Sequence, residues 1–264
     1  MQTVKTEAVA EQPRVLRDSV ALVTGGASGI GKALSLAFAA HGARVAVADV
    51  NGPGAEAVAA DLRSAGGEGL PVVMDVTSRG SVAAGIGAVR AAWDRIDIVA
   101  NVAGWDRIIP FVETTEEFWD RVIAINFRGV LAACHAVLPH MIERRSGVIV
   151  NVSSEAGRAG SSGEAVYSGA KGAVIAFTKA LAREVARYGI RVNCVAPGLT
   201  DTPLLQRMIA DGNERLIQAI VRATPLQRLA TPEEVAEAVV FLASERASFI
   251  TGQTLSVGGG LTMT

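Results

Sequence analysis

A strand, a glycine-rich turn and a helix follow one another near the start of the chain. The apolar run Val20-Ala-Leu-Val-Thr24 is short and continuous, as in a strand that is buried on both faces of a parallel sheet. It leads into Gly25-Gly-Ala-Ser-Gly29-Ile-Gly31 and then into a helical pattern. Glycines permit positive φ and a close approach of the backbone to a pyrophosphate, whose charge a helix N-terminus favours. The unit predicts a dinucleotide-binding turn, although a tight strand-to-helix turn alone gives the same pattern.

The rest of the chain alternates between strand and helix patterns, and no Pro/Gly/Ser-rich linker divides it. Such alternation predicts one α/β domain with a Rossmann-type, doubly wound, parallel seven-stranded sheet, helices on both faces and ligand at the carboxyl ends of the strands. We expect the domain at 19–264, after a flexible leader of residues 1–18. The expected strands are 20–24, 44–49, 70–74, 97–101, 147–153, 190–196 and 253–257, and the expected helices are 29–41, 53–65, 79–93, 115–143, 164–188 and 231–243.

Composition limits the classes of function. Half of the 264 residues are hydrophobic and the formal net charge is −1, which does not favour binding to nucleic acid or to an anionic membrane. No apolar run reaches the length of about 18 residues that a membrane span needs, and the leader has no hydrophobic core, so we expect a cytoplasmic protein. We expect Cys134 and Cys194 to be buried free thiols, and we expect no metal site.

The segment Tyr167-Ser-Gly-Ala-Lys171 places a phenol and an ammonium one helical turn apart. Residues at this spacing share a helix face. The alternative interpretation is an exposed helix pair without a catalytic role. A neighbouring cation favours the phenolate, so we expect the pKa of the phenol to fall from about 10 toward neutrality. Such a tyrosine can take a proton from an alcohol while the alcohol carbon loses hydride to a cofactor.

These residues and several others resemble the short-chain dehydrogenase/reductase family from about Ser19 to Leu261. One departure is Asn101-Val-Ala-Gly104, where the family usually has Asn-Asn-Ala-Gly. Val102 removes an amide that generally supports the central strand, so we expect local repacking. The matching motifs are Thr24-Gly-Gly-Ala-Ser-Gly-Ile-Gly31, Asp75-Val76, Asn101-Val-Ala-Gly104, Asn126, Ser154, Tyr167-x-x-x-Lys171 and Pro197-Gly198.

The resemblance implies a catalytic set of Asn126, Ser154, Tyr167 and Lys171. Tyr167 would be the general acid/base, and Lys171 would lower its pKa together with the charge of the oxidised nicotinamide. Lys171 would also hold the nicotinamide ribose, and Ser154 would bind the substrate oxygen. Ser153 is the competing serine. The matching family asparagine kinks its helix and holds a water of a proton relay, whereas a solvent-facing Asn126 is the structural alternative.

Asp49 ends the second apolar run, where a carboxylate accepts hydrogen bonds from a ribose diol and repels a 2′-phosphate. Because Ser28 and Val50 stand where NADP-preferring relatives carry Lys or Arg, we expect NAD. The residues expected to bind the cofactor are Gly25, Ser28, Gly29, Ile30, Gly31, Asp49, Asp75, Val76, Asn101, Ala103, Gly104, Tyr167, Lys171, Pro197, Gly198, Thr200 and Thr202.

Segments beyond these motifs resemble family members that oxidise alicyclic hydroxyacyl-CoA thioesters, such as 2-hydroxycyclohexanecarboxyl-CoA. They include 104–111, 160–167 and 255–263. We expect Trp105 to form an apolar wall for the ring and Arg158 to reach a carbonyl or phosphate, with Ser154 at the alcohol. By resemblance, residues 199–228 form a mobile lid over the substrate.

Two other functions fit the same sequence. A 3-oxoacyl thioester reductase of the acyl-carrier-protein type usually uses NADPH, which Asp49 disfavours. A non-catalytic dinucleotide-sensing protein would need no aligned proton relay. The family usually assembles as tetramers, so the resemblance also implies a homotetramer that acts on a small-molecule alcohol or ketone.

Overall fold

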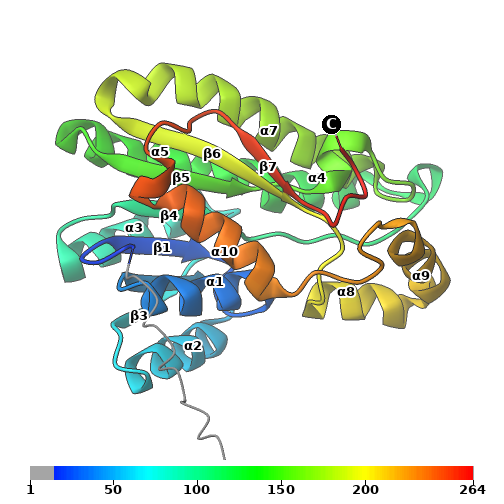
Figure 1. Ribbon diagram of the computed structural model, residues 1–264, viewed down its shortest axis with the longest axis horizontal. Coiled ribbons are helices and arrows are strands. Elements are labelled where there is room, and N and C mark those ends of the chain that lie inside the picture. The colour runs from blue at the N-terminus through cyan, green and yellow to red at the C-terminus, as the bar shows by residue number, and fades with distance from the viewer. Residues whose placement is uncertain (1–14, 264) are drawn as a thin grey trace, which may run out of the picture.

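The computed structural model describes residues 15–263, and its centre is a sheet of seven parallel strands (Figure 1). The strand order is β3-β2-β1-β4-β5-β6-β7, so the order reverses between β1 and β4, where ligands bind in open α/β sheets. The strands are β1 (Val20–Thr24), β2 (Arg44–Asp49), β3 (Gly69–Val73), β4 (Ile98–Asn101), β5 (Gly147–Val152), β6 (Ile190–Pro197) and β7 (Thr254–Val257).

Helices connect the strands, and several begin at a side-chain cap. Thr231, for example, forms a capping box with Glu234, which satisfies backbone donors at the start of its helix. The helices are α1 (Gly29–Ala40), α2 (Gly52–Ser64), α3 (Arg79–Trp93), α4 (Glu116–Ile123), α5 (Gly129–Arg144), α6 (Glu155–Ala159), α7 (Ala165–Val185), α8 (Pro203–Met208), α9 (Glu214–Ala223) and α10 (Pro232–Ala243).

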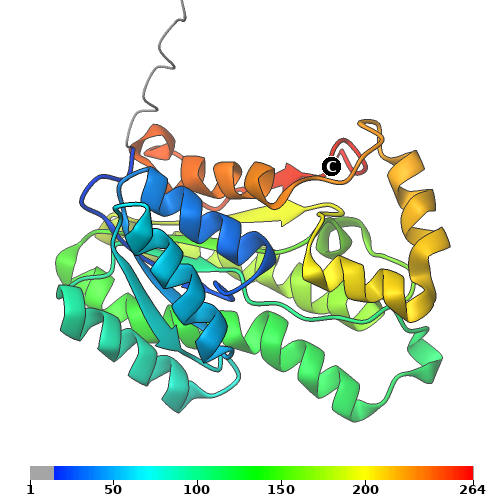
Figure 2. The same ribbon diagram turned by 90° about the horizontal axis from the view of Figure 1, so that it is seen from below.

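The sheet has a separate apolar core on each face (Figure 2). On one face α1, α2 and α10 cover it, with Phe38 and Val240 among the buried residues. On the other face α3, α5 and α7 cover it, around residues such as Ile149 and Val174. The structure confirms the predicted fold class, and each strand lies within one residue of its predicted bounds.

Two predicted boundaries need correction. Of the predicted leader, residues 1–14 lie outside the described part of the chain. Leu16, however, is 3% exposed and packs in the core, and its backbone N–H donates to the His41 carbonyl at 3.0 Å. The folded domain therefore begins before the predicted boundary at residue 19. The helix predicted at 115–143 is α4 and α5 joined by a π-helical turn, Ala124–Arg128.

By length and composition alone, one helical run in the described chain, Glu116–Arg144, is long and apolar enough to cross a membrane. Here that run packs on the sheet against α3 and α7 as a helix of the protein core.

The predicted lid, 199–228, contains α8 and α9, which stand beyond the carboxyl ends of the strands (Figure 2). A π-helical turn, Ile209–Asn213, joins them and bends at Gly212, whose φ is 96°. The pair has its own small apolar cluster of Leu205, Met208 and Ile217. Arg107, in the loop after β4, reaches Asp211 of this turn at 3.4 Å and ties the lid to the sheet.

Candidate active site

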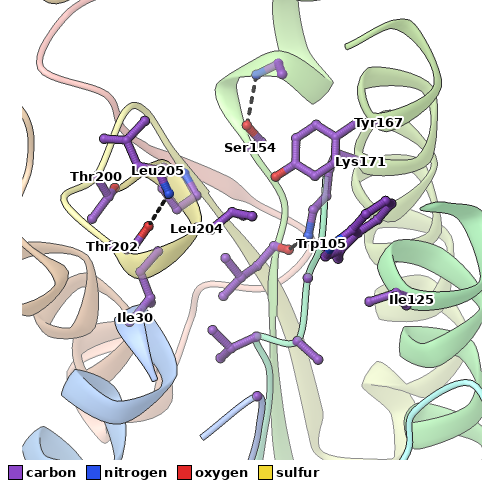
Figure 3. Close-up of a pocket in the computed structure, with 18 of the residues that line it drawn as sticks. Ile30, Trp105, Ile125, Ser154, Tyr167, Lys171, Thr200, Thr202, Leu204 and Leu205 are labelled. Carbon is purple, nitrogen blue, oxygen red and sulfur yellow. Dashed lines mark hydrogen bonds between the residues drawn. The ribbon is translucent and has the colours of Figure 1, made fainter. Parts of the chain in front are cut away.

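A cavity of about 1380 Å³ opens at the carboxyl ends of the strands, between the sheet and the lid (Figure 3). The glycine turn and the ends of β2 and β3 line one side. The ends of β4, β5 and β6, the start of α7 and the helices α8 and α9 line the other. The cavity therefore spans the reversal of strand order at β1 and β4.

The glycine turn is shaped by close backbone contacts. Gly25 has a φ of 69°, and a Cβ there would lie 2.8 Å from the Ala103 Cα. A Cβ on Gly31 would lie only 2.0 Å from the Gly25 carbonyl oxygen. The first turn of α1 thus folds directly onto the end of β1, and its N-terminus faces the cavity, as a pyrophosphate site requires.

Asp49 lies at the end of β2 on the cavity wall. Its carboxylate accepts the backbone N–H groups of Ala27 at 3.1 Å and Asn51 at 2.9 Å. These bonds fix the carboxylate beside the glycine turn, where the ribose of a dinucleotide lies when its pyrophosphate meets α1. The glycine cradle and Asp49 together fit an adenine dinucleotide.

Nearly all the other predicted cofactor residues line the same cavity. Asn101 is the exception: its side chain is 3% exposed and donates to the Asn151 amide oxygen at 2.8 Å, inside the sheet. Asn101 therefore supports the strands and does not line the cofactor cavity. The predicted residues that line the cavity are Gly25, Ser28, Gly29, Ile30, Gly31, Asp49, Asp75, Val76, Ala103, Gly104, Tyr167, Lys171, Pro197, Gly198, Thr200 and Thr202.

Val102 does not loosen the end of β4. Its backbone N–H donates to the Thr24 hydroxyl oxygen at 3.1 Å, and the Ala103 N–H donates to the same atom at 3.3 Å. The Val102 side chain packs against the apolar core on the α1 face. A hydroxyl from β1 and an apolar contact therefore hold this strand end where the family usually has a second amide.

Tyr167, Lys171 and Ser154 meet on one wall of the cavity (Figure 3). The Tyr167 phenol lies beside Ser154 and within hydrogen-bonding reach of its side chain, and the Ser154 hydroxyl oxygen accepts the Ala156 N–H at 3.1 Å. The Lys171 ammonium nitrogen is 5.6 Å from the centroid of the Tyr167 ring and donates to the Val152 carbonyl at 2.9 Å. The Ser153 hydroxyl instead donates to the Lys171 carbonyl at 2.8 Å, which favours Ser154 as the serine that meets a substrate.

The pKa values of Tyr167 and Lys171 on this wall differ from the expectation. Burial, followed by the carboxylates of Glu164 and Asp106, raises the pKa of Tyr167 above its usual value of 10.0. Burial also lowers the pKa of Lys171 to about 8. Burial therefore outweighs any effect of Lys171 on the phenol, so Lys171 by itself does not bring the Tyr167 pKa toward neutrality. The predicted fall in the pKa, which includes the charge of the oxidised nicotinamide, stays a prediction.

Asn126 lies in the π-helical turn and is fully buried, so the solvent-facing alternative is wrong. Its amide nitrogen donates to the carbonyls of Trp105 at 2.7 Å and Val122 at 2.9 Å, and its amide oxygen accepts the Trp105 N–H at 3.3 Å. The widened turn lets the Asn126 side chain form hydrogen bonds both to the backbone of the helix and to the backbone of the loop after β4. Asn126 thus fixes the backbone that carries Gly104 and Trp105 into the cavity.

Of the two predicted substrate residues beyond Ser154, the structure brings only Trp105 to the cavity. Arg158 points away and donates to the Thr254 carbonyl on β7 at 3.4 Å, so its predicted contact with substrate is not supported. Arg121 of α4, by contrast, lines the cavity. Its guanidinium carbon lies 3.9 Å from the centroid of the Trp105 ring, at the cavity wall. The i, i+4 pattern of α4 gave no signal for this contact, because it joins two distant segments.

Thr202 and Thr200 show how β6 leads into the lid. The Thr202 hydroxyl accepts the Leu205 N–H at 3.3 Å and caps α8, and the Thr200 hydroxyl donates to the Gly198 carbonyl at 3.1 Å. Leu204, Leu205 and Met208 present apolar side chains to the cavity. Three apolar residues of the segment 199–228 therefore line the site, whereas Ile209 packs within the apolar cluster of α8 and α9.

Comparison with known proteins now identifies the family. A family model described as enoyl-(acyl carrier protein) reductase matches residues 25–262. This chain belongs to the short-chain dehydrogenase/reductase family. A cis-4-hydroxycyclohexanecarboxylate dehydrogenase of Sinomonas cyclohexanicum is 44% identical over 93% of this chain and 97% of its own length. A 3-oxoacyl-(acyl-carrier-protein) reductase of Thermotoga maritima is 40% identical over 93% of this chain and 98% of its own length.

A solved structure of a 3-ketoacyl-(acyl-carrier-protein) reductase from Brucella melitensis, complexed with NADH, superposes with a TM-score of 0.86. It is 33% identical, with coverage of 94% of this chain and 100% of that chain. The predicted oxidoreductase that acts on secondary alcohols or ketones with a nicotinamide dinucleotide is thereby confirmed, and the alternative of a non-catalytic sensor is not supported.

Proposed function

We propose that the protein oxidises a ring secondary alcohol to the ketone with NAD, and that the ring carries an acyl group. The best candidate substrate is an alicyclic 2-hydroxyacyl-CoA such as 2-hydroxycyclohexanecarboxyl-CoA. The observation that carries the reaction is the convergence of Tyr167, Ser154 and Lys171 on one cavity wall, opposite the apolar lid (Figure 3). The ring alcohol is supported by the relative from Sinomonas cyclohexanicum, whose name specifies a hydroxylated cyclohexane acid.

In this proposal the residues of the chain bind the substrate oxygen and accept the proton of the alcohol. Ser154 donates a hydrogen bond to the substrate oxygen and keeps it beside the phenol, and Tyr167 takes the alcohol proton. A bound NAD would supply the hydride acceptor, and the positive charge of its nicotinamide ring would favour loss of the tyrosine proton. Lys171, held by the Val152 carbonyl, keeps a second cation near the phenol ring.

The choice of NAD rests on Asp49. Its carboxylate is fixed by the N–H groups of Ala27 and Asn51, and the exposed residue after it is Val50. A fixed carboxylate accepts hydrogen bonds from the ribose hydroxyls and repels a 2′-phosphate. Neither Val50 nor Ser28 offers a cation to bind such a phosphate.

An acyl group on the ring is supported by the cations of the cavity wall. Besides Lys171, the basic residues that line the cavity are Arg121 and Arg207. Arg121 is stacked on Trp105 and has no carboxylate partner within residues 15–263. A stacked guanidinium keeps its N–H donors free for a carboxylate, a thioester carbonyl or a phosphate. Trp105 beside it offers an apolar surface to a saturated ring.

The decisive assay is the appearance of NADH absorbance at alkaline pH with 2-hydroxycyclohexanecarboxyl-CoA. The free hydroxy acid, cyclohexanol and NADP run in parallel, with Tyr167→Phe as the inactive control. Turnover of the thioester with NAD alone supports the full proposal. Turnover of cyclohexanol or the free acid in preference to the thioester keeps the reaction and rejects CoA. Turnover of none of the three rejects the ring-alcohol substrate.

A second candidate, reduction of a 3-oxoacyl thioester, is favoured by the 40% identity to the Thermotoga maritima reductase. Asp49 weighs against the NADPH that such reductases usually take. Oxidation of NADH and of NADPH with acetoacetyl-CoA, in separate reactions, distinguishes the two. Fast turnover of NADPH would select the reductase.

We also propose a cytoplasmic homotetramer. Exposed apolar side chains at the end of the chain, Phe249, Leu255 and Met263, support burial against other copies. Light scattering after gel filtration tests this directly, since a monomeric mass rejects it.

A further inference from the structure

A buried carboxyl group lies next to the catalytic tyrosine. Asp106, in the loop after β4, is 2% exposed, and neither of its carboxylate oxygens receives a well-formed hydrogen bond within residues 15–263. The backbone N–H of Arg107 lies close by without satisfying either oxygen. A buried carboxylate without donors is costly, so such a group binds a proton or a cation.

The group that faces Asp106 is a second carboxyl, that of Glu164. Glu164 directly precedes α7, and its carboxyl lies within hydrogen-bonding reach of Asp106. Both line a small pocket with Tyr167, between the apolar side chains of Ile109 and Phe118. Two carboxylates only accept hydrogen bonds, so this contact becomes a hydrogen bond only when one of them holds a proton. Burial, followed by the charge of Glu164, raises the pKa of Asp106 to about 8, which keeps that proton bound at neutral pH.

The pair acts on the catalytic groups through its charge. Glu164, Tyr167 and Lys171 are spaced i, i+3 and i+7, which places them along one side of α7. Both carboxylates raise the pKa of Tyr167, and Asp106 opposes the effect of burial on Lys171. The other charged groups around the pair have separate contacts. Arg107 pairs with Asp211, Arg121 stacks on Trp105, Asp120 lines the cavity, and Glu155 bonds to the Ser256 hydroxyl.

We propose that Asp106 and Glu164 share one proton at neutral pH and that the negative charge of the pair raises the proton affinity of Tyr167. With that charge in place the phenol is favoured over the phenolate. The two acids are positioning residues, since they reach the substrate proton only through Tyr167. The role of Tyr167 in turnover rests on the proposed function, whereas the shared proton and its effect on the phenol do not.

The first test measures the proton affinity of Tyr167 without substrate. The chain has two tyrosines, so in a Tyr188→Phe background the ultraviolet absorbance of tyrosinate reports Tyr167 alone. In that background Asp106→Asn combined with Glu164→Gln removes the charge. We expect the tyrosinate midpoint to fall by about one pH unit or more, as expected when a like charge at close range is removed. An unchanged midpoint in a variant with a native circular dichroism spectrum would overturn the proposal.

The single variants Asp106→Asn and Glu164→Gln are matched controls. Each leaves one carboxylate that accepts a hydrogen bond from the new amide, so each keeps one negative charge near Tyr167. Tyrosinate forms above the Asp106 pKa of about 8, where the parent pair has released its proton and carries two charges. We expect each single variant to have a midpoint between those of the parent and the double variant. A fall in either single variant as large as in the double variant would contradict a shared charge.

Infrared spectroscopy tests the proton itself and remains decisive if the double variant does not fold. The parent protein at neutral pH should show the carbonyl band of a buried protonated carboxyl, and each single variant should lack it. Absence of the band from the parent would overturn the shared proton. None of these measurements needs turnover, so failure of the substrate assay and failure of this proposal are separate results.

Discussion

The two sides of the cavity are built in different ways. The side that faces β1 and β2 is made by backbone: a glycine turn in which a Cβ would lie 2.0 Å from a carbonyl, and a carboxylate held by two N–H groups. The side that faces α7 and the lid is made by side chains from distant segments, such as Trp105 against Arg121. The first kind of site depends on local spacing, whereas the second depends on tertiary packing. Substitutions on the two sides should therefore affect different measurable quantities.

The largest effect is expected on the side-chain side. Tyr167→Phe should lower kcat/KM for alcohol oxidation by about 10³-fold, because it removes the general base. The dissociation constant of NADH, measured by fluorescence, should change little, since the backbone side is untouched. Tyr188→Phe is the matched control and should retain activity, because Tyr188 lies in the short turn after α7 and does not line the cavity. Near-normal turnover in Tyr167→Phe would mean that another group takes the proton.

On the backbone side, Asp49→Ala should shift the preference between NAD and NADP. Loss of the ribose hydrogen bonds and of the repulsion of a 2′-phosphate should change the ratio of the two kcat/KM values by on the order of 100-fold. Asp61→Ala is the control, because Asp61 is an exposed carboxylate that pairs with Lys32 outside the cavity. A preference for NAD that survives in Asp49→Ala would contradict the role given to this carboxylate.

Gly31→Ala tests the glycine cradle. The added Cβ would meet the Gly25 carbonyl oxygen at 2.0 Å, so the turn must shift, at a cost of roughly 2 kcal/mol in the free energy of unfolding. We expect a lower Tm and an affinity for NADH weakened by about tenfold. The matched control is Gly87→Ala in α3, where a Cβ meets nothing within 4 Å, and which should stabilise the protein slightly. Equal NADH affinity in both variants would refute the steric argument.

The smallest effect distinguishes two arginines. Arg121→Ala should raise KM for the acyl-bearing alcohol by about fivefold, since an exposed charge contributes about 1 kcal/mol. It should leave KM for plain cyclohexanol unchanged. Arg158→Ala should change neither KM, because Arg158 contacts the Thr254 carbonyl away from the cavity. The reverse pattern would restore Arg158 as the substrate residue.

The same difference between local spacing and tertiary packing explains which features could be predicted from the sequence. The strand bounds, the glycine turn and Asp49 follow from local patterns that hold wherever the chain continues, and all lie as expected. The placement of Arg158 and Asn101 failed, because a motif position does not say which way a side chain points. The raised pKa of Tyr167 was missed for a related reason. The spacing to Lys171 is local, but burial and the approach of Asp106 depend on tertiary packing.

Besides Arg121, sequence reasoning missed Asp106 and Glu164. Both stand inside segments that resembled the family, next to Trp105 and three residues before Tyr167. No periodicity pairs them, because they come together only when the loop after β4 packs against the start of α7. A carboxyl side chain within a few residues of a catalytic motif is the signal that would have marked them.

The central claim is hydride loss from a ring alcohol carbon in the cavity beside Tyr167. Its most direct test uses a cyclic alcohol substrate with deuterium on the carbinol carbon and mass analysis of the dinucleotide formed. The account predicts that NAD becomes singly deuterated at the nicotinamide ring, and that Tyr167→Phe slows the transfer by about 10³-fold. A ketone formed without deuterium in the dinucleotide, or transfer at an undiminished rate in Tyr167→Phe, would contradict it.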